Sequence, residues 1–185
     1  MMKNILIMGI GRAGKTTLSK MIKDKINSYN LIDSDALKWA MIRANNEEQY
    51  YRKNVDKQKE FEHGEYFQRT LLELYNLLIR KDTKEYGYIL ESGQVHPKIV
   101  KEMIDFNNTI VLCLGLGNFK PEDMVNQCIK YDTQESWTYG LPKEYLLEHA
   151  QDWYNCNEML KQECPKYGIK YIDTSKDRKE ILNKI

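Results

Sequence analysis

Short apolar runs alternate along the chain with longer segments in which apolar residues recur every three or four positions. The runs at residues 5–8 and 109–114 are almost continuously apolar, and glycines follow both. Runs of this length, bounded by turn-forming residues, are typical of strands buried in a parallel sheet. The pattern predicts strands at residues 5–8, 29–32, 88–90, 109–114 and 170–173.

The segments between these runs have the spacing of amphipathic helices. After the first run, Leu18, Met21, Ile22 and Ile26 fall on one helical face. Helices are predicted at about residues 15–27, 36–43, 66–80, 121–131, 142–164 and 177–185 and from about residue 97, and residues 45–63 are expected to be helical with a weak apolar stripe. Strands that alternate with helices form a parallel sheet covered on both faces. The predicted fold class is therefore α/β, in one domain of residues 1–185.

Composition narrows the class of protein further. The 28 basic residues are balanced by 27 acidic ones, which argues against a nucleic-acid partner because phosphate contacts demand a basic surplus. No apolar run approaches the ~20 residues of a membrane span, and the early first strand leaves no room for a signal peptide. We therefore expect a cytoplasmic protein with no membrane partner. The four cysteines lack C-x-x-C spacing, which favours thiols over zinc ligands.

Residues 9–16 satisfy G-x-x-x-x-G-K-[ST], the phosphate-binding loop pattern, between a predicted strand and a predicted helix. Glycines let the backbone wrap around an anion, while the N–H groups at the helix start point into the cavity with the positive end of the dipole. Lys15 would reach the outer phosphates, and Thr16 would place its hydroxyl on a bridging Mg²⁺ ion. An ordinary strand-to-helix turn would explain the glycines but not Lys15.

The loop is therefore expected to bind ATP as a co-substrate together with magnesium. Its expected ATP-binding residues are Gly9, Gly11, Arg12, Ala13, Gly14, Lys15, Thr16 and Thr17.

Acidic residues follow two other predicted strands. Asp33 and Asp35 come directly after residues 29–32, and Glu91 follows residues 88–90. The carboxyl ends of parallel strands share the edge at which ligands of open α/β sheets collect. One carboxylate of the Asp pair would hold magnesium through water, and the other would take the proton from an attacking hydroxyl. Helix capping ahead of Ala36 is the alternative role for this pair.

The phosphate acceptor is expected to bind between these strand ends and the segment at about residues 36–86. Arg43, Arg52 and Arg69 lie in that segment and, together with Glu91, are the candidate acceptor-binding residues. Planar guanidinium groups suit recognition of anionic groups, although an arginine in such a segment is more often a solvated surface residue than a ligand.

These motifs resemble those of P-loop kinases of the nucleoside-monophosphate-kinase and shikimate-kinase type. The resemblance rests on the loop at residues 9–16, on Asp33-Ser34-Asp35, and on Asp173-Thr174-Ser175 after the last strand. It implies a three-layer P-loop NTPase fold with five parallel strands in the order 2-3-1-4-5. It also implies a metal-associated Asp33, a catalytic Asp35, and contact of residues 173–175 with adenine. Lys15, which neutralises the phosphates, is the other residue expected to be catalytic.

The chain departs from the family pattern at two places. Arg12 stands where these kinases often have glycine. The expected lid, at about residues 115–150, contains no arginine, although the family lid usually supplies arginines to the transferring phosphate; its lysines are Lys120, Lys130 and Lys143. Either a lysine or Arg12 would have to replace them. The scarcity of arginines around the acceptor favours a neutral or hydroxylated acceptor over a nucleoside monophosphate.

The function predicted from the sequence is transfer of the γ-phosphate of Mg-ATP to a hydroxyl of a small molecule. A nucleoside or nucleoside-monophosphate kinase is an alternative within the enzymes. A nucleotide-dependent switch or regulatory protein is an alternative from another class, although no guanine-reading N-K-x-D motif is present.

Overall fold

The computed structural model of the chain describes residues 3–81, 86–134 and 136–185. Residues 82–85 of the expected acceptor segment and residue 135 of the expected lid lie outside the described residues. Among the described helices, none combines the length and apolar character that crossing a membrane requires.

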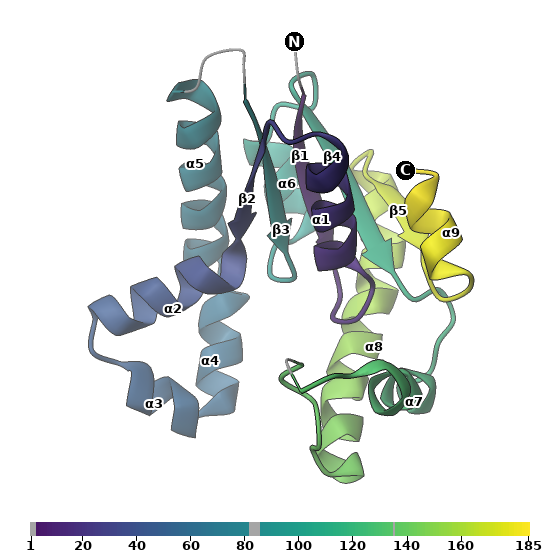
Figure 1. Cartoon of the computed structure of the whole chain (residues 1–185). Coiled ribbons are helices and arrows are strands. Elements are labelled where there is room, and N and C mark those ends of the chain that lie inside the picture. The colour runs from purple at the N-terminus through teal and green to yellow at the C-terminus, as the bar shows by residue number, and fades with distance from the viewer. Residues whose placement is uncertain (1–2, 82–85, 135) are drawn as a thin grey trace.

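The described residues form a five-stranded parallel sheet in the order β2-β3-β1-β4-β5 (Figure 1). The strands are β1 (Asn4–Gly9), β2 (Tyr29–Asp33), β3 (Gly87–Ser92), β4 (Thr109–Gly115) and β5 (Lys170–Asp173). The predicted α/β class and the strand order implied by the family resemblance are both confirmed. Central strands are the most apolar, as burial on both faces requires: Ile5, Leu6, Ile7 and Met8 of β1 are all buried.

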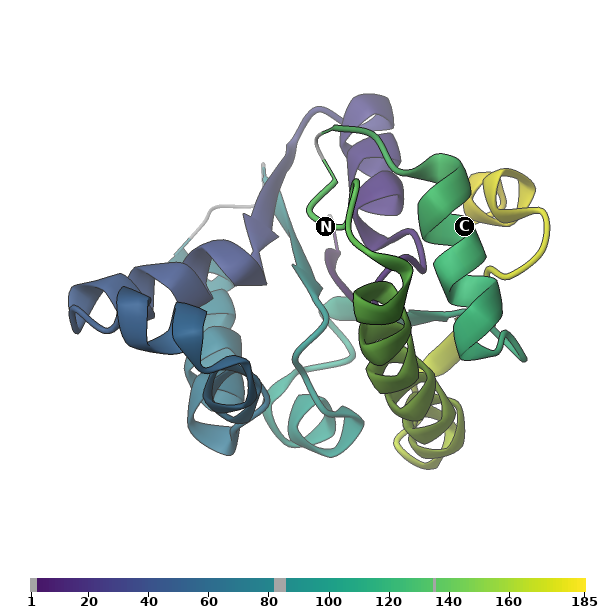
Figure 2. The same cartoon turned by 90° about the horizontal axis from the view of Figure 1, so that it is seen from below.

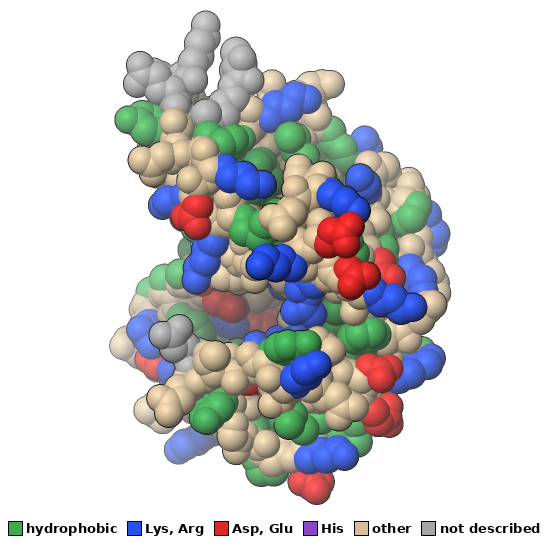
Figure 3. All heavy atoms as spheres, turned by 45° about the vertical axis from the view of Figure 1, so that its right-hand side comes forward, with side chains coloured by type: hydrophobic (Ala, Val, Ile, Leu, Met, Phe, Trp, Pro, Cys, Tyr) green, Lys and Arg blue, Asp and Glu red, His purple; other side chains and the backbone are tan. Residues whose placement is uncertain are grey.

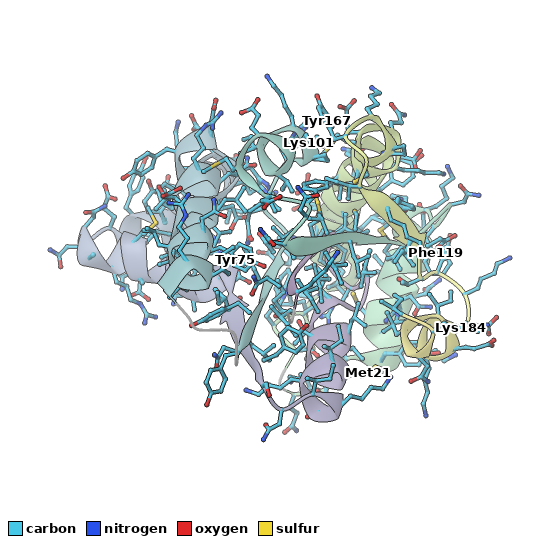
Figure 4. All side chains as sticks on the ribbon, turned by 90° about the horizontal axis from the view of Figure 1, so that it is seen from above. Met21, Tyr75, Lys101, Phe119, Tyr167 and Lys184 are labelled. Atoms are coloured by element: carbon cyan, nitrogen blue, oxygen red, sulfur yellow. The ribbon has the colours of Figure 1, made fainter. Side chains whose placement is uncertain are left out.

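Helices cover both faces of this sheet. They are α1 (Lys15–Lys25), α2 (Ser34–Ala44), α3 (Glu48–Lys53), α4 (Val55–Glu62), α5 (Glu65–Lys81), α6 (Pro97–Met103), α7 (Pro121–Tyr131), α8 (Lys143–Lys166) and α9 (Arg178–Asn183). In the view from above, α1 with Met21 and α9 with nearby Lys184 lie on one side, and Lys101 of α6 and Tyr167 after α8 lie on the other (Figure 4). Seen from below, α2–α4 lie well apart from α7 and from the segment that leads into α8 (Figure 2).

Two helix predictions need correction. Helix α1 ends at Lys25, and Ile26 is an extended C-cap residue with 44% of its surface exposed, so it does not belong to the core face of the helix. The segment at residues 45–63 forms two helices, α3 and α4, because Asn54 between them has a non-helical backbone (φ −126°, ψ 76°). No proline or glycine lies at either break, so the sequence pattern does not reveal them.

A buried asparagine on α8 fixes the chain where β4 ends. The Oδ1 atom of Asn157 accepts hydrogen bonds from the Leu116 N–H (3.0 Å) and the Tyr171 hydroxyl (2.8 Å), and its Nδ2 donates to the Gly117 carbonyl (3.0 Å). Burial raises the pKa of Tyr171 to about 12, so the hydroxyl stays protonated as a donor. The side chain thus joins α8 to the turn after β4 and to β5.

We expect Asn157→Ala to lower the free energy of unfolding by about 2 kcal/mol, because it leaves buried backbone groups without partners. Urea unfolding followed by circular dichroism measures this. Asn155→Ala, at an exposed position of the same helix, is the matched control and should change the free energy by less than ~0.5 kcal/mol. Equal effects of the two substitutions would contradict the role assigned to the buried amide.

Candidate functional site

The glycine-rich loop leaves β1 at Gly9 and enters α1 at Gly14. Both glycines have positive φ angles, 139° and 97°. A Cβ atom at Gly9 would lie 2.0 Å from the Leu114 carbonyl oxygen, so the loop starts in close contact with β4. Gly14 is the N-cap of α1 and provides no side-chain cap, which leaves the first-turn N–H groups of the helix available. This backbone arrangement is suited to binding an anion.

Lys15 directs its ammonium group back into this loop. Its Nζ donates a hydrogen bond to the Ile10 carbonyl oxygen at 2.8 Å. Burial lowers the pKa of Lys15, and the nearby carboxylates of Glu91 and Asp35 partly offset this effect. A polyphosphate in the loop would add negative charge and so favour the charged ammonium form.

Three acidic residues predicted for the site lie at the carboxyl ends of β2 and β3. Asp33 and Glu91 are paired in register on these neighbouring strands. The two carboxylate oxygens of Glu91 accept hydrogen bonds from hydroxyl groups on α1, Oε1 from Thr16 and Oε2 from Ser19, both at 3.1 Å. The structure therefore brings Glu91 next to the phosphate loop, in contact with Thr16.

These residues also fit the donor set that magnesium uses in nucleotide sites. Mg²⁺ is commonly held by one or two carboxylates, a hydroxyl and the phosphates themselves, with waters completing the octahedron. Within the described parts of the chain no group of three or more His, Cys, Asp or Glu side chains forms a cage for an all-protein metal site. The hydroxyl of Thr16 with the carboxylates of Asp33 and Glu91 matches the open kind of magnesium site.

Asp33, the last residue of β2, and Asp35, in the first turn of α2, have different surroundings. Asp33 caps α2, since its Oδ1 accepts a hydrogen bond from the Asp35 N–H at 2.9 Å. The capping role considered for this pair is thus present in Asp33. Asp35 Oδ1 accepts from Gln94 Nε2 at 2.8 Å and forms an ion pair with Lys38 at 2.9 Å. The side chain of Asp35 is nevertheless 58% exposed, so a ligand at the strand ends has access to its carboxylate.

The three candidate arginines of the acceptor segment form ion pairs with glutamates. Arg43 and Arg52 share Glu48, at 2.9 and 2.7 Å, and both arginines are exposed. The contacts of Arg69 are with Glu65 and Glu102, each at 2.6 Å. The structure does not bring these guanidinium groups to the carboxylates at the strand ends.

Arg12 connects the phosphate loop to the segment that follows α7. Its backbone is left-handed (φ 65°), and its guanidinium donates to Asp132 Oδ2 at 3.0 Å and also to the Thr138 hydroxyl. On the other side of the loop, the indole of Trp153 from α8 lies 2.8 Å from where a Cβ atom at Gly11 would stand. The loop is thus flanked by the expected lid and by α8.

The residues after β5 differ in how accessible they are. Thr174 is fully buried and its hydroxyl lies 2.8 Å from the Ala13 carbonyl and 3.0 Å from the Gly115 carbonyl, so it fastens the phosphate loop to the end of β4. Asp173 is exposed, and its Oδ1 accepts from the Ser175 N–H at 2.8 Å. Of the three expected adenine contacts, residues 173 and 175 have accessible side chains.

Several side chains of the site did not emerge from the sequence. They are Ser19, Lys38, Gln94, Trp153 and Arg178. Ser19 lies one helical turn after Thr16 and Lys38 one turn after Asp35, spacings that indicate a shared helix face. Arg178 packs against Gly14, and burial lowers the pKa of its guanidinium. Gln94 and Trp153 carry no sequence signal, because tertiary packing alone brings them to the site.

A hollow opens in the molecular surface in the space-filling view, with acidic and basic side chains on its walls (Figure 3). Charged groups of both signs also meet at the strand ends, where the carboxylates of Glu91 and Asp35 interact electrostatically with the Lys15 ammonium group. Such a site can hold a polyphosphate through backbone amides and an ammonium group, with a metal and a proton acceptor beside it.

No protein-family profile and no curated protein matches this sequence. Solved structures do match its fold. A shikimate kinase from Acinetobacter baumannii, in complex with shikimate, aligns with a TM-score of 0.57 at 15% identity, covering 100% of this chain and 90% of that one. A gluconokinase from Sinorhizobium meliloti 1021 aligns with a TM-score of 0.55 at 12% identity, covering 98% and 87%.

A deoxyadenosine kinase from M. mycoides with bound dATP aligns with a TM-score of 0.54 at 19% identity, covering 98% of this chain and 96% of that one. These three proteins are all kinases by name, and each alignment spans nearly the whole chain. The comparisons confirm the predicted fold: the chain has the same three-layer α/β fold as these three kinases.

Proposed function

We propose that the protein is a small-molecule kinase that transfers the γ-phosphate of Mg-ATP to a hydroxyl group. The observation that carries the proposal is that the glycine-rich loop holds Lys15 and that Thr16, the next residue, donates a hydrogen bond to the carboxylate of Glu91. An anion-binding loop alone would suit any nucleotide-binding protein. Carboxylates beside it provide both a magnesium site and a proton acceptor, which phosphoryl transfer to a hydroxyl requires.

Each residue then has a definite role. The loop amides and the Lys15 ammonium bind the phosphates. Thr16 and Asp33 would hold magnesium, with Glu91 as a further carboxylate for its water shell, and the ion would supply positive charge to neutralise the phosphates. Asp35 accepts the proton of the acceptor hydroxyl while the oxygen of that hydroxyl bonds to the γ-phosphorus. The bond from that phosphorus to the bridging oxygen breaks, and ADP leaves.

The acceptor is proposed to lack a phosphate group of its own. A phosphorylated acceptor is normally held by guanidinium groups, since these bind phosphate through paired hydrogen bonds. The arginines of α2, α3 and α5 form ion pairs with glutamates instead. This arrangement favours a hydroxylated small molecule or a nucleoside over a nucleoside monophosphate.

The proposal is tested by following ADP release from Mg-ATP with and without a panel of polyols, sugar acids, nucleosides and nucleoside monophosphates. Stimulation by one small-molecule acceptor, with phosphate recovered on that molecule, is the expected result. If ADP release responds only to a partner protein, the chain is a nucleotide-dependent switch and the kinase proposal is wrong.

Arg12 is proposed to replace the arginines that the lid lacks. Arg12 belongs to the phosphate loop itself, and its guanidinium joins that loop to Asp132 in the expected lid. Arg12→Gly removes only the side chain, because glycine adopts the positive φ angle freely. We expect kcat of the Arg12→Gly variant to fall about tenfold, and fixed-time assays of ADP release measure this. Arg80→Ala, at an exposed position at the end of α5, should leave kcat unchanged, and an unchanged kcat in the Arg12 variant would refute this role.

A further inference from the structure

Lys38 is a deeply buried charged side chain near the strand ends, and the proposed reaction leaves it without a role. Only 7% of its side-chain surface is exposed. Its Nζ lies 2.7 Å from Glu62 Oε2 and 2.9 Å from Asp35 Oδ1. Lysine is almost never buried to this degree unless it is paired, so the two carboxylates account for its position.

The ammonium group of Lys38 remains charged. Burial by itself lowers the pKa of Lys38, but the contacts with Glu62 and then Asp35 outweigh it, and the pKa is raised overall. One buried cation therefore forms ion pairs with two carboxylates, those of Asp35, proposed as the proton acceptor, and Glu62, at the end of α4.

The second contact to Asp35 is oriented by a separate chain of hydrogen bonds. Gln94 Oε1 accepts from the hydroxyls of Ser34 (2.6 Å) and Ser92 (2.9 Å). Because an ionised carboxylate can only accept hydrogen bonds, the end of the Gln94 amide that faces Asp35 is the NH₂ group, and it donates to Asp35 Oδ1. Lys38 and Gln94 thus contact the same carboxylate oxygen of Asp35, and the side chain is still 58% exposed, which leaves Oδ2 available to a ligand.

Glu62 connects this arrangement to the acceptor segment. It is the last residue of α4 and only 14% of its side-chain surface is exposed. Helix α4 also contacts α8, because Lys59 of α4 forms an ion pair with Asp152 of α8. The position of α4 is therefore coupled to Asp35 through Lys38 and to α8 through Lys59.

We propose that Lys38 is a positioning residue for phosphoryl transfer: it fixes the carboxylate of Asp35 and, through Glu62, makes that orientation depend on where α4 lies. This inference rests on the proposed kinase function. Packing alone does not require it, since a methionine of similar length would fill the same space without the cost of burying a charge. A proton acceptor must be held within a fraction of an ångström of its working position, and a flexible carboxylate reacts more slowly.

The test compares Lys38→Met with Lys57→Met, which removes an exposed lysine of α4 that is paired with Glu60. We expect kcat to fall roughly 10- to 100-fold in the Lys38 variant, while the Kd for ATP changes less than about twofold. The Lys57 variant should match the wild type. In the Asp35→Asn background, Lys38→Met should cause no further loss of kcat, because the group it positions is already inactive.

A purely structural role predicts a different pattern. Lys38→Met would then lower the midpoint of urea unfolding with kcat unchanged per folded molecule, or its effect on kcat would multiply with that of Asp35→Asn. Either result overturns the proposal. If the methionine variant does not fold, Glu62→Gln and Lys38→Arg decide: loss of kcat in the first and its retention in the second support positioning, and the reverse refutes it.

Failure of the kinase proposal is distinguishable from failure of this one. If the wild-type protein transfers phosphate to no acceptor, the proposed function fails. Crystal structures of the wild type and Glu62→Gln then test the positioning separately. A displaced Asp35 carboxylate in the variant supports the inference, and an unchanged carboxylate refutes it.

Discussion

Replacing Lys15 by alanine is expected to weaken ATP binding by at least about 100-fold and to abolish measurable turnover. The ammonium group is the charged side chain directed into the loop, where burial strengthens its attraction for phosphate compared with a solvated lysine. Isothermal titration calorimetry with Mg-ATP measures the affinity. ADP release measures turnover.

Lys20→Ala is the control for Lys15→Ala, because Lys20 is exposed on the same helix and its replacement removes the same single charge. Its affinity for Mg-ATP should equal that of the wild type. If Lys15→Ala bound and turned over ATP normally, the phosphate site would lie elsewhere, and the proposed function would be lost with it.

The second large effect is expected from Asp35→Asn, which should lower kcat by about 100-fold or more with little change in ATP affinity. Asparagine has the same shape, and its amide oxygen can still accept from Lys38 and Gln94. Its NH₂ group would then face the acceptor, where it cannot take up a proton. The chemistry is removed while the hydrogen bonds are kept.

Single-turnover transfer from labelled ATP measures the loss in the Asp35 variant. Asp24→Asn, at an exposed position of α1, controls for the change in charge. Full activity in Asp35→Asn would show that another group takes the proton, and Glu91 would be the next residue to substitute, although its two hydrogen bonds to α1 make a role near magnesium the better fit.

The amino-acid sequence by itself determined the strands, most of the helices and the phosphate loop of this protein. These features depend on residues close together in the chain. The apolar run of β1 and the following glycines predicted a buried strand that turns sharply into a helix, and the structure has that arrangement. The strand order followed only from the family resemblance, because local patterns do not specify which strands are neighbours.

Local patterns were less informative about the arginines of the acceptor segment. Arg52 and Arg69 each have a glutamate four residues earlier, and both form that ion pair. This spacing along a helix is a signal that could have indicated surface pairing rather than a ligand contact. Arg43 pairs with Glu48 across the start of α3, which periodicity did not define.

The tertiary structure alone decided which side chains complete the site. Ser19 and Glu91 are 72 positions apart, Asp35 and Gln94 are 59 apart, and Lys38 and Glu62 are 24 apart. Each contact forms because parallel strands bring their carboxyl ends to one edge and because α2 and α4 pack beside it. Such contacts depend on how the whole chain folds back on itself, so the residue types of the phosphate loop could be recognised in the sequence, whereas the partners that orient its carboxylates could not.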